Sequence, residues 1–149
     1  MAEREYMAVE RVEAPNQLLQ VDIATKRLLK KASERDFPYY YQLGVMVPVE
    51  KLQKGKYVEA EYACLPLQYR IEDDCCEEKK EGSYIRGYHV GDYDTIGITY
   101  EKMLERIREE GLEAEGFSYE YCVLDSLTTR NMQEYVTEIQ IPVRRPEKR

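Results

Sequence analysis

The sequence contains no tryptophan, one histidine and two phenylalanines among its 149 residues, yet it contains 14 tyrosines. His89 is the only histidine, so no partner is available at a spacing that suits a histidine metal site or a catalytic triad. Tyrosine provides apolar area, a π face and a hydroxyl at a low cost in rotamer entropy, which suits an adaptable binding surface. Tyrosine also favours strands, so each one has a structural explanation as well.

Long basic runs and long apolar runs are also missing. The 22 basic side chains are outnumbered by 29 acidic ones, and the formal net charge is −7. We therefore expect no direct contact with nucleic acid through this chain. No apolar run approaches the roughly 18 residues of a membrane span, and residues 1–5 show no signal-peptide pattern. We expect a cytoplasmic protein without a membrane partner.

Four cysteines are too few for a disulfide framework in a chain of this length. Cys64 and Cys122 lie in strand-like runs and are expected to be small buried residues. Cys75 and Cys76 are adjacent in an acidic stretch, which we interpret as a solvated loop with two thiols. The spacing of cysteine and histidine does not indicate zinc, and no phosphate-binding glycine loop is present. We therefore expect neither a metal site nor a cofactor.

Hydrophobic periodicity predicts strands and helices in the same order in both halves of the chain. Alternation predicts six strands, over residues 6–12, 39–49, 57–69, 83–90, 117–125 and 134–143. Helical spacing predicts a helix over 18–32 and another over 95–110, with Gly111 as the C-terminal cap of the second. A turn is expected over 50–56, and an acidic loop over 72–82 separates the halves.

The halves also share residues at one constant offset in the numbering. The same offset relates Tyr6 to Tyr84, Val12 to Val90, and Leu29 to Ile107. The pattern predicts an α+β fold of tandem duplicated βαββ units, with two antiparallel sheets and one long helix each. The predicted halves cover about 4–71 and 82–143 of a single domain, 1–149, with a cleft between them for a ligand.

A carboxylate interrupts the most aromatic of these strands. Glu120 lies between Tyr119 and Tyr121, and the constant offset pairs it with Gln42. A buried carboxylate needs a partner, because an unpaired buried charge costs several kcal/mol. Two interpretations are open. Glu120 is either the counter-ion of a ligand or a structural carboxylate paired with a basic side chain or a tyrosine hydroxyl.

Several segments carry a family resemblance: residues 84–94, the helix that ends at 111–112, the run 119–121 and residues 134–143. They resemble the GyrI-like effector-binding fold, which also forms the C-terminal multidrug-binding domain of bacterial MerR-type (BmrR-like) transcription regulators. The resemblance implies a pocket between the halves for hydrophobic, often cationic, aromatic small molecules. Glu120 matches the buried glutamate that compensates the ligand's positive charge in this family, and Tyr135 matches a pocket tyrosine on the last strand.

The remaining candidate ligand contacts come from element position and repeat symmetry. They are Tyr119, Tyr41, Gln42, Tyr57, Tyr88 and Tyr93. The expected function is small-molecule sensing, either as the effector-binding part of a transcription regulator, with DNA bound by a separate N-terminal domain, or as a free-standing drug-sequestering protein. Some members of the resembled family hydrolyse reactive small molecules, which gives Glu120 and Tyr135 a catalytic alternative. A topoisomerase-inhibitor-like interaction surface is the third possibility.

Overall fold

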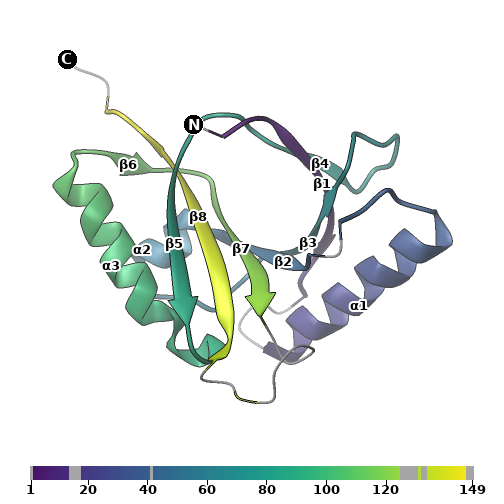
Figure 1. Cartoon of the computed structure of the whole chain (residues 1–149), viewed down its shortest axis with the longest axis horizontal. Coiled ribbons are helices and arrows are strands. Elements are labelled where there is room, and N and C mark those ends of the chain that lie inside the picture. The colour runs from purple at the N-terminus through teal and green to yellow at the C-terminus, as the bar shows by residue number, and fades with distance from the viewer. Residues whose placement is uncertain (1, 14–17, 41, 125–130, 132–133, 147–149) are drawn as a thin grey trace.

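The structure is a computed structural model of the chain, which describes residues 2–13, 18–40, 42–124, 131 and 134–146. Its strands form one antiparallel sheet of eight strands in the order β4-β1-β3-β2-β7-β8-β5, with β6 paired to β8 (Figure 1). The strands are β1 (Glu5–Arg11), β2 (Gly44–Pro48), β3 (Tyr62–Leu67), β4 (Cys76–Lys79), β5 (Ser83–Val90), β6 (Glu113–Ala114), β7 (Phe117–Leu124) and β8 (Val136–Arg144).

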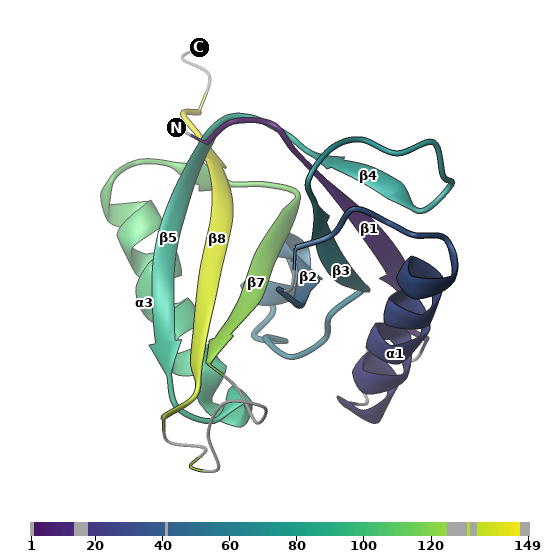
Figure 2. The same cartoon turned by 45° about the vertical axis from the view of Figure 1, so that its right-hand side comes forward.

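The sheet curls into a half-barrel whose two edges meet at one end. Ala2, just before β1, pairs with Gly82, just before β5, through two backbone hydrogen bonds of 2.7 and 3.0 Å. Figure 2 shows the start of β5 and the N-terminal segment converging at this end while the edge strands diverge toward the other. This curl gives the sheet a concave side, which we call the inner face.

The helices lie on the other face of the sheet. They are α1 (Leu18–Glu34), α2 (Val49–Gln53) and α3 (Ile96–Glu109), with a 3-10 turn η1 (Tyr93–Thr95) before α3. Figure 1 shows α1 and α3 flanking opposite ends of the sheet. The buried apolar residues of α3 pack with Ile139 and Ile141 of β8, and those of α1 pack with Ala8 and Leu65. Every helix in the described residues is too short or too polar to cross a membrane.

The prediction of two separate sheets is wrong, because β2 and β7 join the halves. Residues 44–48 pair antiparallel with residues 117–121, so the strands of both halves continue one sheet. The helices α1 and α3 keep the constant offset, since they begin at Leu18 and Ile96. The strands β1 and β5 keep it too, since they begin at Glu5 and Ser83, but the pairing of each with its neighbouring strand does not. Tyr6 pairs with Leu67, whereas Tyr84 pairs with Pro142 and not with Arg145, the counterpart of Leu67 at that offset. The duplication therefore stays a prediction.

Most predicted elements are present, with three additions. The short helix α2 lies in the predicted turn, β6 follows α3, and β4 lies in the predicted acidic loop. Because β4 forms in this loop, the adjacent Cys75 is buried at 8% exposure rather than solvated. Cys64 is buried as expected, whereas Cys122, which was expected to be buried, is exposed. Gly111 follows the C-cap residue of α3 with φ of 69°, the left-handed conformation that a glycine cap provides, which confirms that prediction.

Candidate functional site

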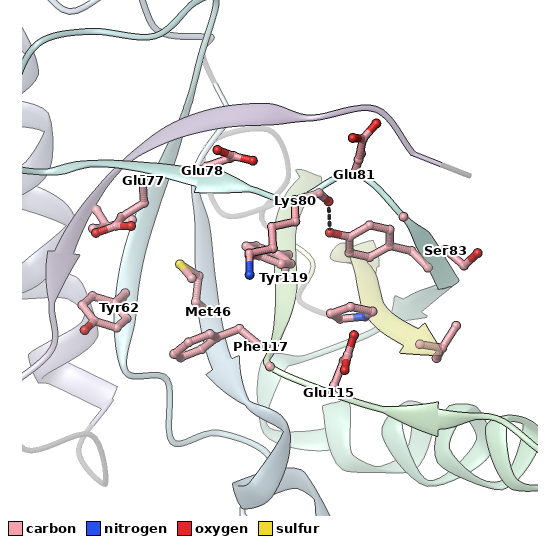
Figure 3. Close-up of a pocket in the computed structure, with 16 residues that line it drawn as sticks. Met46, Tyr62, Glu77, Glu78, Lys80, Glu81, Ser83, Glu115, Phe117 and Tyr119 are labelled. Carbon is pink, nitrogen blue, oxygen red and sulfur yellow. Dashed lines mark hydrogen bonds between the residues drawn. The ribbon is translucent and has the colours of Figure 1, made fainter. Parts of the chain in front are cut away.

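The inner face contains a cavity of about 600 Å³ near the end where the two edges meet (Figure 3). Three rings and a thioether line its base, and we call them the aromatic floor: Tyr62, Phe117, Tyr119 and Met46. Four carboxylates surround its opening, and we call them the acidic rim: Glu77, Glu78, Glu81 and Glu115. Lys80 is the one basic residue that lines this cavity among the described residues.

Strand alternation produces the aromatic floor. Because successive side chains of a strand point to opposite faces, Phe117 and Tyr119 of β7 share the inner face. Phe117 meets the Tyr62 ring edge-on, with 5.9 Å between centroids and 70° between ring planes. Tyr119 meets Tyr84 of β5 in the same way, at 6.4 Å and 64°. Such edge-to-face pairs hold aromatic rings in fixed orientations.

The acidic rim is only partly neutralised. Arg4 lies 3.0 Å from Glu78 and 3.8 Å from Glu81, and Arg144 lies 3.2 Å from Glu115. Glu77 forms no ion pair within the part of the chain that the structure describes. Its charge contributes to raising the pKa of the Tyr119 hydroxyl, which burial raises first and Tyr84 raises further. The opening therefore favours positively charged groups.

A buried lysine lies behind this cavity. Lys79 is the last residue of β4 and is 1% exposed. Its ammonium lies 4.9 Å from the ring centroids of Tyr84 and Tyr119 and 5.2 Å from that of Tyr121, three rings that we call the tyrosine cage. It also donates to the side-chain oxygen of Gln140 and lies 3.5 Å from a carboxylate oxygen of Glu5. Burial lowers the pKa of Lys79, and Glu5 opposes the change.

A second cavity of about 680 Å³ lies on the other side of the tyrosine cage. Tyr121, Glu5 and Gln140 line it, together with Gln42, one of the predicted ligand contacts. Its remaining lining is mostly polar or aromatic: Arg4, Tyr6, Tyr40, Gln68, Tyr69, Arg70 and Glu138, with Pro66 and Leu67. The inner face thus carries two cavities with different chemistry.

Glu120 lies on the opposite face of β7, beneath α3. It is 2% exposed and accepts a hydrogen bond from the Tyr100 hydroxyl, which also lies 2.8 Å from the hydroxyl of Ser118. Burial raises the pKa of Glu120 to about 7, although Tyr100 and Tyr93 lower it in part. The second carboxylate oxygen of Glu120 and the Tyr93 hydroxyl are buried without a well-formed hydrogen bond in the described residues. The partner that the sequence did not reveal is therefore a tyrosine of α3.

Two other predicted contacts lie near Glu120 rather than in a cavity of the inner face. Tyr93 belongs to η1 and is partly buried against the core beneath α3. The Tyr57 ring stacks on Tyr100 with 5.7 Å between centroids and lies over Gly97 of α3. A Cβ atom at Gly97 would come within 2.6 Å of the Tyr57 ring, which explains glycine inside this helix.

The remaining predicted residues are scattered. Tyr88 is 53% exposed and donates to Glu138 at 3.1 Å. Tyr135 immediately precedes β8, where its backbone oxygen accepts a 2.8 Å hydrogen bond from Gly91. Tyr41 lies outside the described residues. Of the predicted contacts, the structure therefore brings Tyr119 and Gln42 to the inner-face cavities.

Several cavity residues were not predicted from the sequence. Phe117 follows from the same alternation as Tyr119, so a strand argument identifies it. Lys79 and most of the acidic rim lie in or near β4, whose sequence is typical of a solvated loop. The lysine that enters the tyrosine cage had no sequence signal, because its burial depends on how rings from β5 and β7 come together around it.

Metal binding has no support among the described residues, where no three His, Cys, Asp or Glu side chains cluster. His89 instead stabilises the turn between β5 and α3. Its two ring nitrogens lie 2.6 Å from the hydroxyl of Thr99 and 3.0 Å from that of Thr95. The same nitrogen that faces Thr95 is 3.0 Å from the backbone oxygen of Asp92. The lone histidine is therefore explained by local structure.

Comparison with solved structures identifies the fold. The crystal structure of the EcmrR C-terminal domain has a TM-score of 0.78 at 14% identity, covering 97% of this chain and 94% of that one. EcmrR in a complex with DNA has a TM-score of 0.77 at 13% identity. The match covers 97% of this chain but only 56% of the EcmrR chain. A hydrolase from Listeria innocua has a TM-score of 0.57 at 13% identity, covering 95% of this chain and 88% of that one.

The family assignment comes from the sequence. No curated protein matches the chain significantly. The model of the GyrI-like small molecule binding domain matches residues 24–144, which is most of the chain and includes β2, β7, β8 and both long helices apart from the start of α1. The chain therefore belongs to the GyrI-like family of small-molecule-binding domains.

Proposed function

We propose that this domain binds hydrophobic organic cations in the cavity between the aromatic floor and the acidic rim. The observation that carries the proposal is the combination of both features around one cavity of about 600 Å³. A volume of this size is typical of pockets for drug-sized ligands, which are largely apolar with a few polar groups. The aromatic floor suits the flat apolar part of such a ligand, and the acidic rim suits its charge.

The energetics support micromolar affinity without a close shape fit. A cation over an aromatic face gains about 0.5–2 kcal/mol, and apolar burial adds roughly 25 cal/mol per Å². Met46 adds an adaptable thioether, a side chain that accommodates ligands of different shape. Broad specificity for cationic aromatic compounds is the expected consequence, as in a multidrug-binding domain.

Within this proposal, the domain is the effector-binding part of a MerR-type transcription regulator. The likeness of its fold to the EcmrR C-terminal domain, and the presence of EcmrR in a DNA complex, support this placement. DNA would then be bound by another domain, which agrees with the net charge of −7. A free-standing drug-sequestering protein is the alternative, and both share the ligand site.

We assign the direct ligand contacts to Tyr119 and the rest of the aromatic floor. We assign Glu120 a structural role, in which its hydrogen bond with Tyr100 connects β7 to α3. A ligand in the cavity lies on the other face of the sheet from the Glu120 carboxylate, which is 2% exposed. The same burial disfavours hydrolysis with Glu120 as the general acid or base, because such a group must reach its substrate. We therefore propose binding rather than turnover.

The charge of the acidic rim gives the first prediction. Replacing Glu77 and Glu115 together by glutamine is expected to weaken binding of a cationic rhodamine dye by about 3- to 10-fold, since each exposed pair contributes roughly 0.2–1 kcal/mol. A neutral dye of similar size should bind both proteins equally. The measurement is a fluorescence titration at low and at physiological salt, where screening reduces the difference.

The matched control replaces Glu105 and Glu109 together by glutamine, which removes two carboxylates from the exposed side of α3. Its affinity for the cationic dye is expected to equal that of the wild type. If the wild type binds no dye, the proposed function is wrong. If the control weakens binding as much as the rim variant, the effect is one of net charge and the cavity is not its origin.

A further inference from the structure

The tyrosine cage has the composition of a cation-binding site. Tyr84 comes from β5, and Tyr119 and Tyr121 come from alternate positions of β7. All three ring centroids lie between 4.9 and 5.2 Å from one ammonium nitrogen, within the range in which a cation and a π face attract each other. Rings arranged around one point in this way are the usual means of binding alkylammonium groups. In this protein the group inside the cage is the ammonium of Lys79.

Lys79 reaches the cage from the end of the half-barrel where the two edges of the sheet meet, since its partner Glu5 and the cage residue Tyr84 both lie near the bridge between Ala2 and Gly82. Lys79 ends β4, an edge strand that pairs with β1, whereas the cage rings belong to β5 and β7 on the other side of the sheet. The preceding residues Glu77 and Glu78 of the same strand are exposed. One side chain of a short edge strand therefore occupies the middle of the inner face.

The ammonium also lies between the two cavities. Tyr84 and Tyr119 line the cavity with the acidic rim, while Tyr121 and two further contacts of Lys79, Glu5 and Gln140, line the second cavity. The walls of both cavities thus meet at the Lys79 side chain. Withdrawal of this side chain would join the two cavities through the tyrosine cage.

The charge of Lys79 is only weakly compensated. Glu5 is its one ion-pair partner among the described residues, at 3.5 Å, and the Glu5 side chain is 54% exposed. Burial therefore lowers the pKa of Lys79, even though Glu5 and Glu138 raise it in part. An ammonium held mainly by rings and one amide is easier to displace than one held by a buried carboxylate.

We propose that Lys79 is a tethered competitor, which fills the tyrosine cage in the unliganded protein and excludes organic cations from it. This inference rests on the proposed function and deepens it. The side chain restricts wild-type ligands to the outer cavity, where they contact the aromatic floor. Organic cations with a bulky onium centre enter the cage only when Lys79 leaves it. Lys79 is thus a specificity-determining residue of the cation site.

The test uses two probes of the same shape and opposite charge, tetraphenylphosphonium and tetraphenylborate, titrated calorimetrically into the full chain. Lys79→Met keeps an unbranched side chain of similar length and removes the charge. It is expected to bind tetraphenylphosphonium roughly tenfold or more tightly than the wild type, because a neutral thioether neither repels the cation nor is held by Glu5 and Gln140, so the cation displaces it from the cage. Tetraphenylborate is expected to bind it several-fold more weakly than it binds the wild type, since an attractive ammonium is lost.

The matched control is Lys102→Met, which removes a positive charge from the exposed side of α3, outside both cavities, and leaves the cage filled. It is expected to change tetraphenylphosphonium affinity less than threefold, as one exposed charge does. Thermal unfolding followed by circular dichroism checks that each variant is folded. If Lys79→Met shows no cooperative transition, Lys79→Gln replaces it with the same expected direction.

The outcomes separate this inference from the proposed function. If Lys79→Met binds tetraphenylphosphonium as the wild type does, or more weakly, the competitor role is overturned while the cation-binding function stands. An equal gain in Lys102→Met also overturns it, because the effect is then one of general charge. If neither the wild type nor the variants bind tetraphenylphosphonium, both the function and the inference fail.

Discussion

Glu120→Gln is expected to stabilise the protein by about 2–3 kcal/mol at pH 8 and to leave its stability at pH 4.5 nearly unchanged. The pKa of this carboxyl is about 7 in the folded protein, against its ordinary value of 4.5. At about 1.4 kcal/mol per pKa unit, holding the carboxylate ionised in the core costs roughly 3 kcal/mol. Glutamine does not ionise, so the variant avoids this cost.

The sign follows from proton binding. Well below pH 4.5 the carboxyl is protonated in both the folded and the unfolded protein, and it contributes no pH dependence. Between pH 4.5 and about 7 the folded protein keeps a proton that the unfolded chain has released, so wild-type stability falls as the pH rises. Above about pH 7 the cost is complete and constant.

The neighbouring hydroxyls make glutamine a suitable replacement. Its amide oxygen can accept the hydrogen bond that Tyr100 now donates to Glu120. Its amide nitrogen can donate to the Tyr93 hydroxyl, which is buried without a well-formed hydrogen bond in the described residues. Satisfying a buried polar group in this way is favourable, because an unpaired one costs about 1–3 kcal/mol.

The measurement is urea unfolding of the wild type, Glu120→Gln and the exposed control Glu109→Gln at pH 4.5, 6 and 8. A difference between wild type and Glu120→Gln that is the same at all three pH values would contradict the buried, raised-pKa carboxyl. The same variant tests the site. We expect its affinity for a cationic rhodamine to stay within twofold of wild type, whereas a selective loss for cations would make Glu120 the ligand's counter-ion.

Gly44→Ala is expected to destabilise the protein by roughly 3 kcal/mol or more, because the added methyl group would clash with backbone atoms, which cannot change rotamer as a side chain can. A Cβ atom at Gly44 would lie 2.6 Å from the backbone oxygen of Glu120 and 2.9 Å from both the Cys64 sulfur and the Tyr121 ring. Gly44 pairs with Tyr121 of β7 and Cys64 of β3. The added methyl group must therefore displace the strand that joins the two halves.

Gly87→Ala is the matched control, since it also adds a methyl group to a strand glycine at a short distance. The nearest atom to its Cβ would be the Met103 sulfur, at 2.7 Å. A methionine side chain can change rotamer, so we expect a loss below about 1 kcal/mol. Denaturant unfolding of both variants gives the comparison. Equal losses would show that the β2–β7 junction tolerates displacement as easily as a flexible side chain does.

The local elements of this fold are largely predictable from the sequence. Alternation predicts β5 with its observed bounds, Ser83–Val90, and places Tyr119 and Glu120 of β7 on opposite faces. Helical spacing predicts α3 to within a residue at each end. These signals are local, because the period of the apolar residues is set by the backbone geometry of each element.

The arrangement of the sheet depends on pairings between distant residues. The sequence contains no signal that β2 pairs with β7, which joins the two predicted sheets into one. Alternation separates the two faces of β7 but does not say which face α3 covers. The prediction therefore placed Glu120 in the ligand pocket, whereas its side chain contacts Tyr100 of α3.

The candidate site was predictable only in part. Tyr119 follows from its strand, and Gln42 from the repeat, and both line inner-face cavities. Lys79 did not follow, because the segment Cys76–Lys79 is too short and too charged to show strand periodicity. Its burial results from a pairing with β1, which lies near the start of the chain, and from rings on β5 and β7.

The backbone bridge between Ala2 and Gly82 ties the first residues of the chain to the opening of the cavity. Gly82 lines that cavity and follows Glu81 of the acidic rim. Any displacement of residues 80–82 that accompanies release of Lys79 must stretch or break the two hydrogen bonds to Ala2. We therefore expect the hydrogen-exchange rate of the Ala2 amide to rise when Lys79 leaves the cage.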